Sequence, residues 1–375
     1  MSIKLLIGGS PCTYWSCAQK RNRETQAEGL GWELFKNYLI AKEKFKPDFF
    51  LYENNKSASQ AIKDQIKHEL GVWDGSILTE DSGARYIEIN SALVSAQNRQ
   101  RFYVHNCGEV QQPIDRGIHI SDILESNVGK PINICVDEKS RTIKAQYQQS
   151  SIANFVTNGG HDATGVAQRI PAYGNQEKAR PVKASYANKG AGQGSLKTEC
   201  FPAGTVKEKS DYIVEPSRDN SGDVYRVVNG LIYISGKEYP IDLEDGDYTI
   251  RKLTVKECCR LQTMPDDYMK SVSASQGYKG IGNGWTAEVI IHILNYALKN
   301  VPKDEEIVVL SMYDGIGTGR YCLDKMGFTN VKYYAYEIDK YAMTVAKDNY
   351  PDIIECGDAF QVRDNNWSIY CNKEE

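Results

Sequence analysis

The stretch IVVLSMYDGIGTGRYCLDKMG (307–327) begins with a short apolar run, turns through glycines and continues with apolar residues at helical spacing. A buried parallel strand reads as a continuous apolar run, so this stretch predicts a strand, a glycine turn and a helix. Residues 332–350 repeat the pattern with Glu337 at the end of the strand, and 352–358 add a third short strand. Strands that alternate with helices predict an α/β fold around a parallel sheet.

The rest of the chain contains two kinds of sequence pattern. Further strands and helices are predicted in the following stretches: 3–9, 31–44, 49–53, 94–107, 253–265 and 286–300. From about Gly108 to Asp247, by contrast, glycine and polar residues are dense and helical periodicity is scarce, which predicts a smaller, mostly β domain with long loops. The predicted boundaries are 1–107 and 251–375 for the two parts of the α/β domain, and 108–250 for the small domain.

The composition excludes several classes of protein. Among the 375 residues no apolar stretch approaches the roughly 20 residues that a membrane-spanning helix needs. The apolar run at the start is too short for a signal peptide, so we expect the chain to stay inside the cell. The ten cysteines include no C-x-x-C pair, so neither a zinc site nor a disulfide framework is predicted.

Charge is unevenly distributed, although the net charge is only −4. Residues 139–200 contain nine Lys or Arg against three Asp or Glu, and residues 301–375 contain eight against fourteen. Such a split fits a polyanionic partner, and an ordinary solvated surface accounts for it equally well. Two similar segments, EKSRTIKAQY (138–147) and EKARPVKASY (177–186), lie in the basic part. They supply Arg141, Lys144, Arg180 and Lys183 as candidate backbone contacts, or resemble each other by chance.

Side chains at the predicted strand ends indicate a ligand-binding site and a catalytic pair. A glycine turn after a strand presents backbone N–H groups at the carboxyl edge of the sheet, where Glu337 could bind ribose hydroxyls and Asp358 an adenine amino group. This pattern favours a nucleoside site. Cys12 follows a strand and the turn GGSP, and Glu53 ends the next strand. Parallel strands would bring the two side chains to one edge as a nucleophile and an acid.

Eight motifs together resemble those of the DNA cytosine-5 methyltransferases. They are GGSPC (8–12), ENN (53–55), QNRQR (97–101), RKLTVKECCRLQTMPDDY (251–268), GIGNGWTAEVIIHI (280–293), SMYDGIGTG (311–319), YEID (336–339) and GDAF (357–360). GGSPC, SMYDGIGTG and Trp285 are most similar to the animal de novo subgroup. The cofactor motifs come last here and first in most of the family, so the resemblance implies a circularly permuted member. It implies a Rossmann-like methyltransferase sheet, with residues 108–250 as the target recognition domain.

The resemblance also implies roles for individual residues. Cys12 would add to C6 of a cytosine flipped out of the duplex, Glu53 would engage N3 and the exocyclic amine, and Arg99 and Arg101 would hold the base carbonyl and nearby backbone. S-adenosylmethionine would be the cofactor, with no metal. Its pocket would be lined by Pro11, Asn283, Trp285, Tyr313, Gly315, Gly317, Thr318, Glu337, Ile338, Asp358 and Ala359. Lys20, Arg21 and Arg23, in the loop after Cys12, would contact phosphates.

One departure and two alternatives remain open at the level of sequence. Asn55 stands where the family usually has valine, so an extra amide beside the cofactor could accommodate a modified methyl donor. Double-stranded DNA is the implied substrate, with the protein acting alone or beside a cognate restriction enzyme in the cytoplasm of a bacterial or phage-infected cell. The alternatives are methylation of cytosine in RNA of the transfer-RNA type, and a catalytically silent DNA-binding relative.

Overall fold

The computed structural model describes residues 2–16, 23–72, 82–125, 131–133, 140–141, 165–169, 224–234, 237–241 and 243–369. In the first part of the chain the elements are β1 (Ile3–Gly8), η1 (Cys12–Tyr14), α1 (Gly29–Phe45), β2 (Phe49–Asn55), α2 (Gln60–Glu69), β3 (Arg85–Asn90), η2 (Ser91–Leu93), β4 (Gln97–Asn98), β5 (Gln100–His105) and α3 (Ile120–Ile123). The small domain holds β6 (Pro131–Asn133), β7 (Ser140–Arg141), β8 (Gly165–Arg169), β9 (Val224–Val228), β10 (Leu231–Ile234), β11 (Lys237–Pro240) and β12 (Gly246–Lys252). The remaining elements are α5 (Val255–Leu261), α6 (Ala274–Asn283), α7 (Ala287–Leu298), β13 (Ile307–Met312), α8 (Thr318–Lys325), β14 (Val331–Tyr336), α9 (Lys340–Asn349), β15 (Ile354–Gly357) and η6 (Ala359–Arg363).

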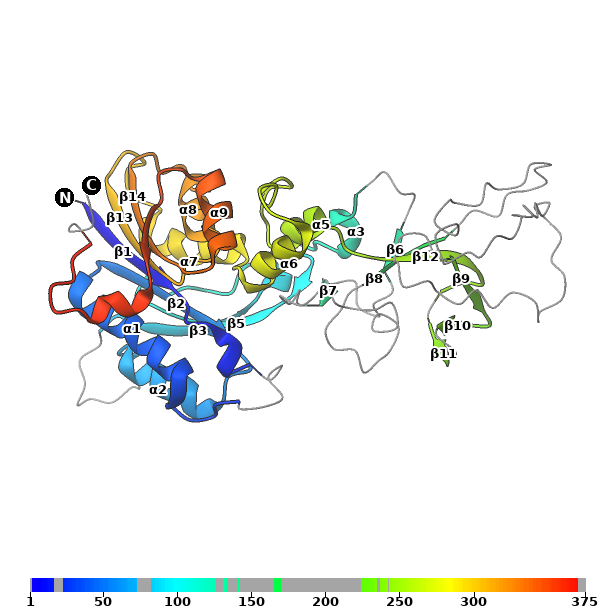
Figure 1. Cartoon of the computed structure of the whole chain (residues 1–375), viewed down its shortest axis with the longest axis horizontal. Coiled ribbons are helices and arrows are strands. Elements are labelled where there is room, and N and C mark those ends of the chain that lie inside the picture. The colour runs from blue at the N-terminus through cyan, green and yellow to red at the C-terminus, as the bar shows by residue number, and fades with distance from the viewer. Residues whose placement is uncertain are drawn as a thin grey trace, which may run out of the picture.

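A seven-stranded sheet forms the centre of the large domain, in the order β15-β14-β13-β1-β2-β5-β3 (Figure 1). The five strands from β15 to β2 are parallel, as the sequence predicted, but β5 runs antiparallel to both of its neighbours. The parallel sheet predicted from the sequence is thus extended at this edge by two strands in antiparallel pairing. The chain returns from β3 to β5 through the short elements η2 and β4, and antiparallel neighbours need no helical crossover.

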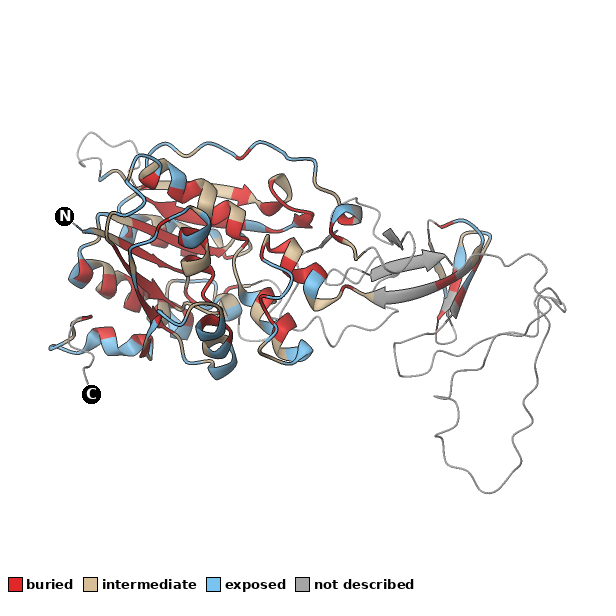
Figure 2. Cartoon of the chain, turned by 90° about the horizontal axis from the view of Figure 1, so that it is seen from above, coloured by how far each residue is buried: buried red, intermediate tan, exposed pale blue. Residues whose placement is uncertain are grey.

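Helices cover both faces of this sheet, and β1 shows why its sequence is apolar throughout. Leu6 packs with residues of α1 and α2 on one face, whereas Leu5 and Ile7 pack with residues of α7 and α8 on the other. All three side chains are fully buried. Alternate side chains of a strand point to opposite faces, so a strand covered on both sides has no polar face. Figure 2 shows the buried residues concentrated on the sheet and on the helix surfaces facing it.

The small domain contains a six-stranded sheet, in the order β11-β10-β9-β12-β8-β6, in which all the paired strands are antiparallel. It extends from one end of the large domain (Figure 1). Arg116 forms an ion pair with Glu288 of α7, and α3 packs beside both α5 of the large domain and β6 of the small domain. At the other end, β12 continues to Lys252. The predicted domain bounds stay a prediction.

No helix within the described ranges is long and apolar enough to cross a membrane.

Candidate active site

A cavity of about 570 Å³ lies at the carboxyl ends of the parallel strands. Its wall includes residues that directly follow β1, β13, β14 and β15, together with residues of β2 and β5 and the turn between α6 and α7. The carboxyl edge of a doubly wound sheet is where ligands bind in this class of fold. Segments more than 300 positions apart in the sequence, from Gly9 to Phe360, therefore contribute to one site.

Cys12 lines this cavity as the first residue of η1, four residues beyond the end of β1. The preceding Gly9 allows a close approach, because a Cβ atom added there would lie 2.5 Å from the backbone oxygen of Glu53. Burial raises the pKa of the Cys12 thiol and the nearby Glu53 carboxylate adds to this effect, whereas Arg101 and Arg99 act in the opposite direction. Cys12 is thus mainly a thiol in the resting protein, next to two cations that favour its ionisation.

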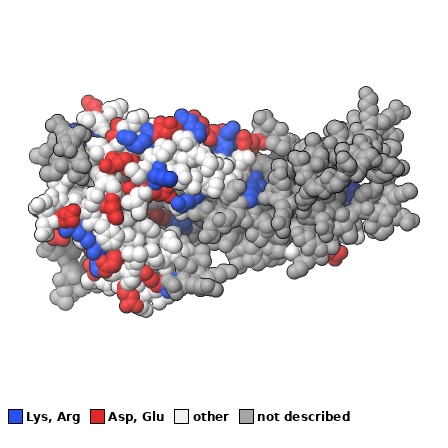
Figure 3. Space-filling view, in the orientation of Figure 1, with Lys and Arg blue, Asp and Glu red and all other residues white. Residues whose placement is uncertain are grey.

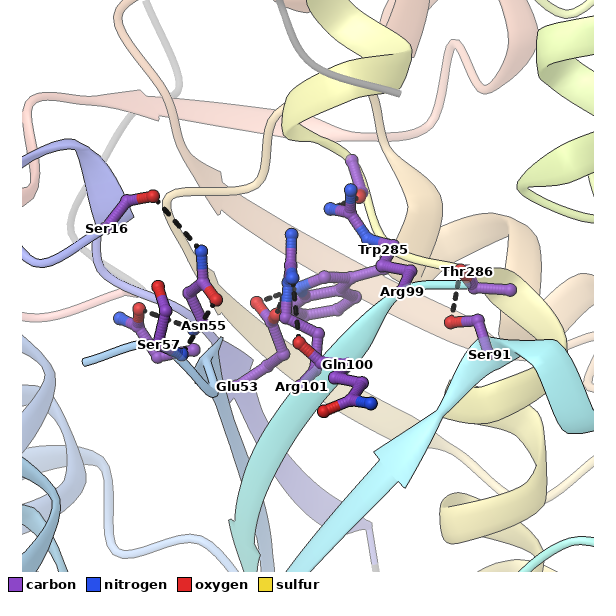
Figure 4. Close-up of polar contacts among 12 residues, drawn as sticks. Ser16, Glu53, Asn55, Ser57, Ser91, Arg99, Gln100, Arg101, Trp285 and Thr286 are labelled. Carbon is purple, nitrogen blue, oxygen red and sulfur yellow. Dashed lines mark hydrogen bonds and ion pairs between the residues drawn. The ribbon is translucent and has the colours of Figure 1, made fainter. Parts of the chain in front are cut away.

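The Glu53 carboxylate is held at both oxygens (Figure 4). Arg101 Nε lies 2.9 Å from Oε1, and the indole nitrogen of Trp285 donates a hydrogen bond of 3.0 Å to Oε2. Glu53 and Arg101 are both buried, and all three residues line the cavity. A buried carboxylate with a charged and a neutral donor is fixed in orientation, as the base-engaging acid of the sequence prediction requires.

Arg99 is also buried at the cavity, and its guanidinium is in contact with the protein backbone. Its two terminal nitrogens donate to backbone oxygens, at 2.7 Å to Gly284 of the α6–α7 turn and at 3.3 Å to Gly282 in the last turn of α6. Burial and the neighbouring charge of Arg101 lower the pKa of Arg99. The structure therefore gives Arg99 a contact with this turn, which sequence reasoning did not predict because the partners are more than 180 positions away.

Most of the residues predicted for the cofactor line the same cavity. Ten of the eleven line its wall: Pro11, Asn283, Trp285, Tyr313, Gly315, Thr318, Glu337, Ile338, Asp358 and Ala359. The exception is Gly317, which has a left-handed backbone conformation before α8 and lies against Ala346. Glu337 accepts hydrogen bonds from the backbone N–H groups of Gly315, Ile338 and Asp339. The glycine turn and the strand-end acid are thus in direct contact, as expected for a nucleoside site.

Asp314 is a further residue of this wall that sequence reasoning missed. Its Oδ1 accepts hydrogen bonds of 2.6 Å from the hydroxyls of Ser311 and Tyr333, while Oδ2 is buried without a protein partner. Burial raises the pKa of Asp314 to about 6. The hydroxyl oxygen of Thr318, on the same wall, is also buried and unpartnered. The acidic residue inside the motif DGIGTG was the available signal, because buried acceptors at a cavity wall mark a place for a donor.

Asn55 does not lie beside the predicted cofactor site. Its side-chain nitrogen donates to Ser16 Oγ at 3.3 Å, its side-chain oxygen accepts from the N–H of Ser57, and it does not line the cavity. The expectation that this amide alters the cofactor pocket is therefore wrong. Residue 55 ends β2 and its side chain is directed toward the segment that follows Cys12 (Figure 4).

The residues predicted to bind DNA mostly lie outside the described ranges, as Lys20, Arg21, Lys144, Arg180 and Lys183 do. Arg23 is described, and its guanidinium donates to the backbone oxygens of Trp15 and Ser57. Arg141 pairs through β7 with Asn98 of β4. On the face of the large domain seen in Figure 3, basic side chains are interspersed with acidic ones. Of the basic segment predicted for 139–200, only residues 140–141 and 165–169 lie within the described ranges, so that segment stays a prediction.

No group of three or more His, Cys, Asp or Glu side chains that could hold a metal ion occurs in the described part of the chain. The six cysteines for which the structure gives a state are free thiols.

Comparison with solved structures gives a loose likeness. A crystal structure of a Spodoptera frugiperda DNMT2 mutant aligns over 78% of this chain and 78% of that chain, with 14% sequence identity and a TM-score of 0.38. A likeness at this level carries no argument about function.

Comparison with known sequences is more informative. Type II methyltransferase M.SsoII of Shigella sonnei is 26% identical over 76% of this chain, and M1.ScrFI of Lactococcus lactis subsp. cremoris is 25% identical over 80%. The chain spans 62% and 64% of the length of these two relatives, and 78% of the 26% identical M.FnuDI of Fusobacterium nucleatum. The model of the C-5 cytosine-specific DNA methylases matches residues 1–299. The chain therefore belongs to the C-5 cytosine-specific DNA methylase family.

Proposed function

We propose that this protein is a DNA cytosine-5 methyltransferase that moves a methyl group from S-adenosylmethionine to C5 of a flipped-out cytosine. The observation that carries the proposal is the shared cavity. A thiol and a fixed carboxylate, Cys12 and Glu53, line it together with a glycine turn and strand-end acids. The nucleophile and the nucleoside-type site therefore face the same cavity. Methyl transfer between two bound molecules requires such an arrangement.

The cavity wall suits S-adenosylmethionine. Glu337 and Asp358 offer carboxylates at successive strand ends, where ribose hydroxyls and an adenine amino group would find acceptors. The unpartnered Oδ2 of Asp314 and the Thr318 hydroxyl offer acceptors for the ammonium group of the methionine part. When bound, this cofactor supplies an electrophilic methyl group. The residues that would hold it are those named above, with Tyr313 and Trp285 as aromatic walls.

The remaining chemistry belongs to side chains of the chain itself. We expect Cys12 Sγ to form a bond with C6 of the cytosine while Glu53 engages N3, which draws electron density from the ring and makes C5 nucleophilic. After methyl transfer, loss of the C5 proton and cleavage of the Sγ–C6 bond restore the thiol. A cytosine stacked in a duplex cannot reach Cys12, so the base must first be flipped out at a cost of a few kcal/mol.

We further propose that the chain is circularly permuted relative to most of the family. The family model matches residues 1–299, while the glycine turn and the acids Glu337 and Asp358 follow in residues 300–375. β1 lies between β13 and β2 and is parallel to both, so the last and first parts of the chain form one continuous sheet. Lys4 and Ile369 line one small surface cavity, which places the two ends of the described chain close together. Proximity of termini is what a permutation requires.

Duplex DNA is the proposed partner, and the small domain is the proposed target recognition domain. Its labelled strands extend from one end of the large domain (Figure 1), and we propose that this domain contacts DNA beside the flipped base. The basic residues of the segments 138–147 and 177–186 remain candidates for backbone contacts, as do Lys20 and Arg21. A cognate restriction enzyme and a cytoplasmic location in a bacterial or phage-infected cell stay predictions.

The test is nucleoside mass spectrometry of mixed-sequence duplex DNA after incubation with the protein and S-adenosylmethionine. We expect 5-methyl-2′-deoxycytidine with the wild-type protein and none with Cys12→Ala, while binding to the duplex is retained. Methylated cytidine in transfer RNA but not in DNA would replace the substrate assignment. If Cys12→Ala were as active as the wild-type protein, Cys12 could not be the nucleophile. If the wild-type protein bound DNA but methylated no base, the protein would be a catalytically silent DNA-binding relative instead.

A further inference from the structure

The turn between α6 and α7 contributes to the wall of the cavity. Trp285 of this turn lines the cavity, as do Asn283 at the end of α6 and the catalytic candidates Cys12 and Glu53. The family resemblance gave Trp285 a place in the cofactor pocket only. The structure adds a second contact, because the indole N–H donates to Glu53 Oε2 at 3.0 Å (Figure 4). One side chain therefore touches both the cofactor space and the carboxylate proposed to engage the cytosine.

The contact between Trp285 and Glu53 is directional. Arg101 Nε occupies Oε1 of the same carboxylate at 2.9 Å. Two donors arriving from different elements, β5 and the α6–α7 turn, fix the rotation of the carboxyl group about its last bond. Without the indole N–H, Glu53 would be held at one oxygen only and could turn about that remaining contact.

The position of the indole is itself fixed by bonds on each side of Trp285. Arg99 holds the backbone oxygen of Gly284, the preceding residue, at 2.7 Å. Thr286, the following residue, is buried; its hydroxyl donates to Gln262 Oε1 at 2.7 Å and accepts from Ser91 Oγ at 2.9 Å. These bonds are internal to the protein and require no ligand. The indole donor is therefore already aimed at Glu53 before any substrate arrives.

We propose that Trp285 is a positioning residue for Glu53, in addition to forming a wall of the cofactor site. Its indole N–H holds the carboxyl group in the orientation that meets the cytosine, and Arg99 serves the same purpose indirectly by fixing the turn. This inference rests on the proposed function and deepens it. It separates two tasks of one side chain: the ring bounds the cofactor space, and the N–H orients the acid.

Trp285→Phe separates these tasks, since phenylalanine keeps an aromatic wall and removes the donor. We expect the dissociation constant for S-adenosylmethionine, measured by calorimetry, to stay within about threefold, because an aromatic wall remains. The methyl-transfer rate at saturating cofactor and DNA should fall by about tenfold to a hundredfold, as loss of a hydrogen bond to a charged group predicts. Trp367→Phe is the matched control: it also removes an indole N–H bond, here to Tyr336, and should change the rate by less than about threefold.

A double-mutant cycle with Glu53→Gln gives a readout that general loosening of the site would not produce. If the indole acts through Glu53, Trp285→Phe should slow the Glu53→Gln protein by less than about threefold. Additive losses would overturn the inference, as would a Trp285→Phe protein that loses cofactor affinity but turns over normally at saturation. A wild-type protein that methylates no cytosine would instead overturn the proposed function, so the two failures are distinguishable.

Discussion

Arg101 and Glu53 form a buried ion pair across two antiparallel strands, with Nε of the arginine 2.9 Å from Oε1 of the glutamate. In the register of β2 and β5, Arg101 lies opposite Asn55, so the pair is diagonal rather than directly opposed. Diagonal partners are within reach of long side chains, and arginine is long enough to cover that distance. The sheet register thus places the cation on the same edge as Cys12.

Removing one partner of this pair should destabilise the protein strongly. In Arg101→Met the Glu53 carboxylate would remain buried with Trp285 as its remaining side-chain donor, at a cost of about 3–5 kcal/mol in unfolding free energy. The measurement is the urea midpoint at neutral pH. The double variant Arg101→Met with Glu53→Gln removes both charges and should recover much of the loss. An unchanged midpoint in the single variant would mean that the pair contributes nothing to stability.

The rate of methyl transfer should rise with pH above neutrality. Burial raises the pKa of the Cys12 thiol, so the thiolate fraction grows as pH increases through the neutral range. The test is the single-turnover rate from about pH 6.5 to about pH 9. In Arg101→Gln a nearby positive charge is lost, so the rising part of the profile should move to higher pH. A flat profile in the wild-type protein would contradict thiol ionisation as a control on the rate.

Cofactor affinity should depend on the charge of Asp314. Its pKa is raised to about 6, so the carboxylate that would meet an ammonium group is lost as pH falls below that value. We expect S-adenosylmethionine to bind more weakly below about pH 6, and Asp314→Asn to weaken binding by about tenfold or more at neutral pH. In the variant the pH dependence should disappear. Calorimetry across this range is the measurement, and identical titrations for both proteins would exclude the ammonium contact.

Glu337 should contribute to cofactor binding in two ways that separate variants distinguish. Its carboxylate accepts three backbone N–H bonds around the glycine turn and is also open to the cavity. Glu337→Ala removes both functions and should weaken cofactor binding by about tenfold or more, whereas Glu337→Gln keeps one acceptor oxygen and should lose less. Equal affinity in Glu337→Ala would count against a cofactor site at this strand end.

The sequence predicted those parts of the site that depend on patterns among neighbouring residues. The strand-to-turn segment at 307–319 and the turn before Cys12 could be placed because apolar runs and glycines mark strand ends. The contacts of Arg99 with Gly284 and of Trp285 with Glu53 could not be predicted, because side-chain partners far apart in sequence leave no periodic signal. The antiparallel direction of β5 was missed for a related reason. An apolar strand buried on both faces reads the same in either direction.

The position of β1 bears on how this chain is made. Ile3 pairs with Ile307 and Gly8 with Met312, so β1 finds one of its two neighbours in the sheet only after β13 has been synthesised. Until then that edge of an apolar strand has no partner of its own and is open to wrong pairing or aggregation. Contacts between residues this far apart in the sequence also form slowly during folding. A nascent chain that stops before β13 would therefore lack a partner that β1 requires.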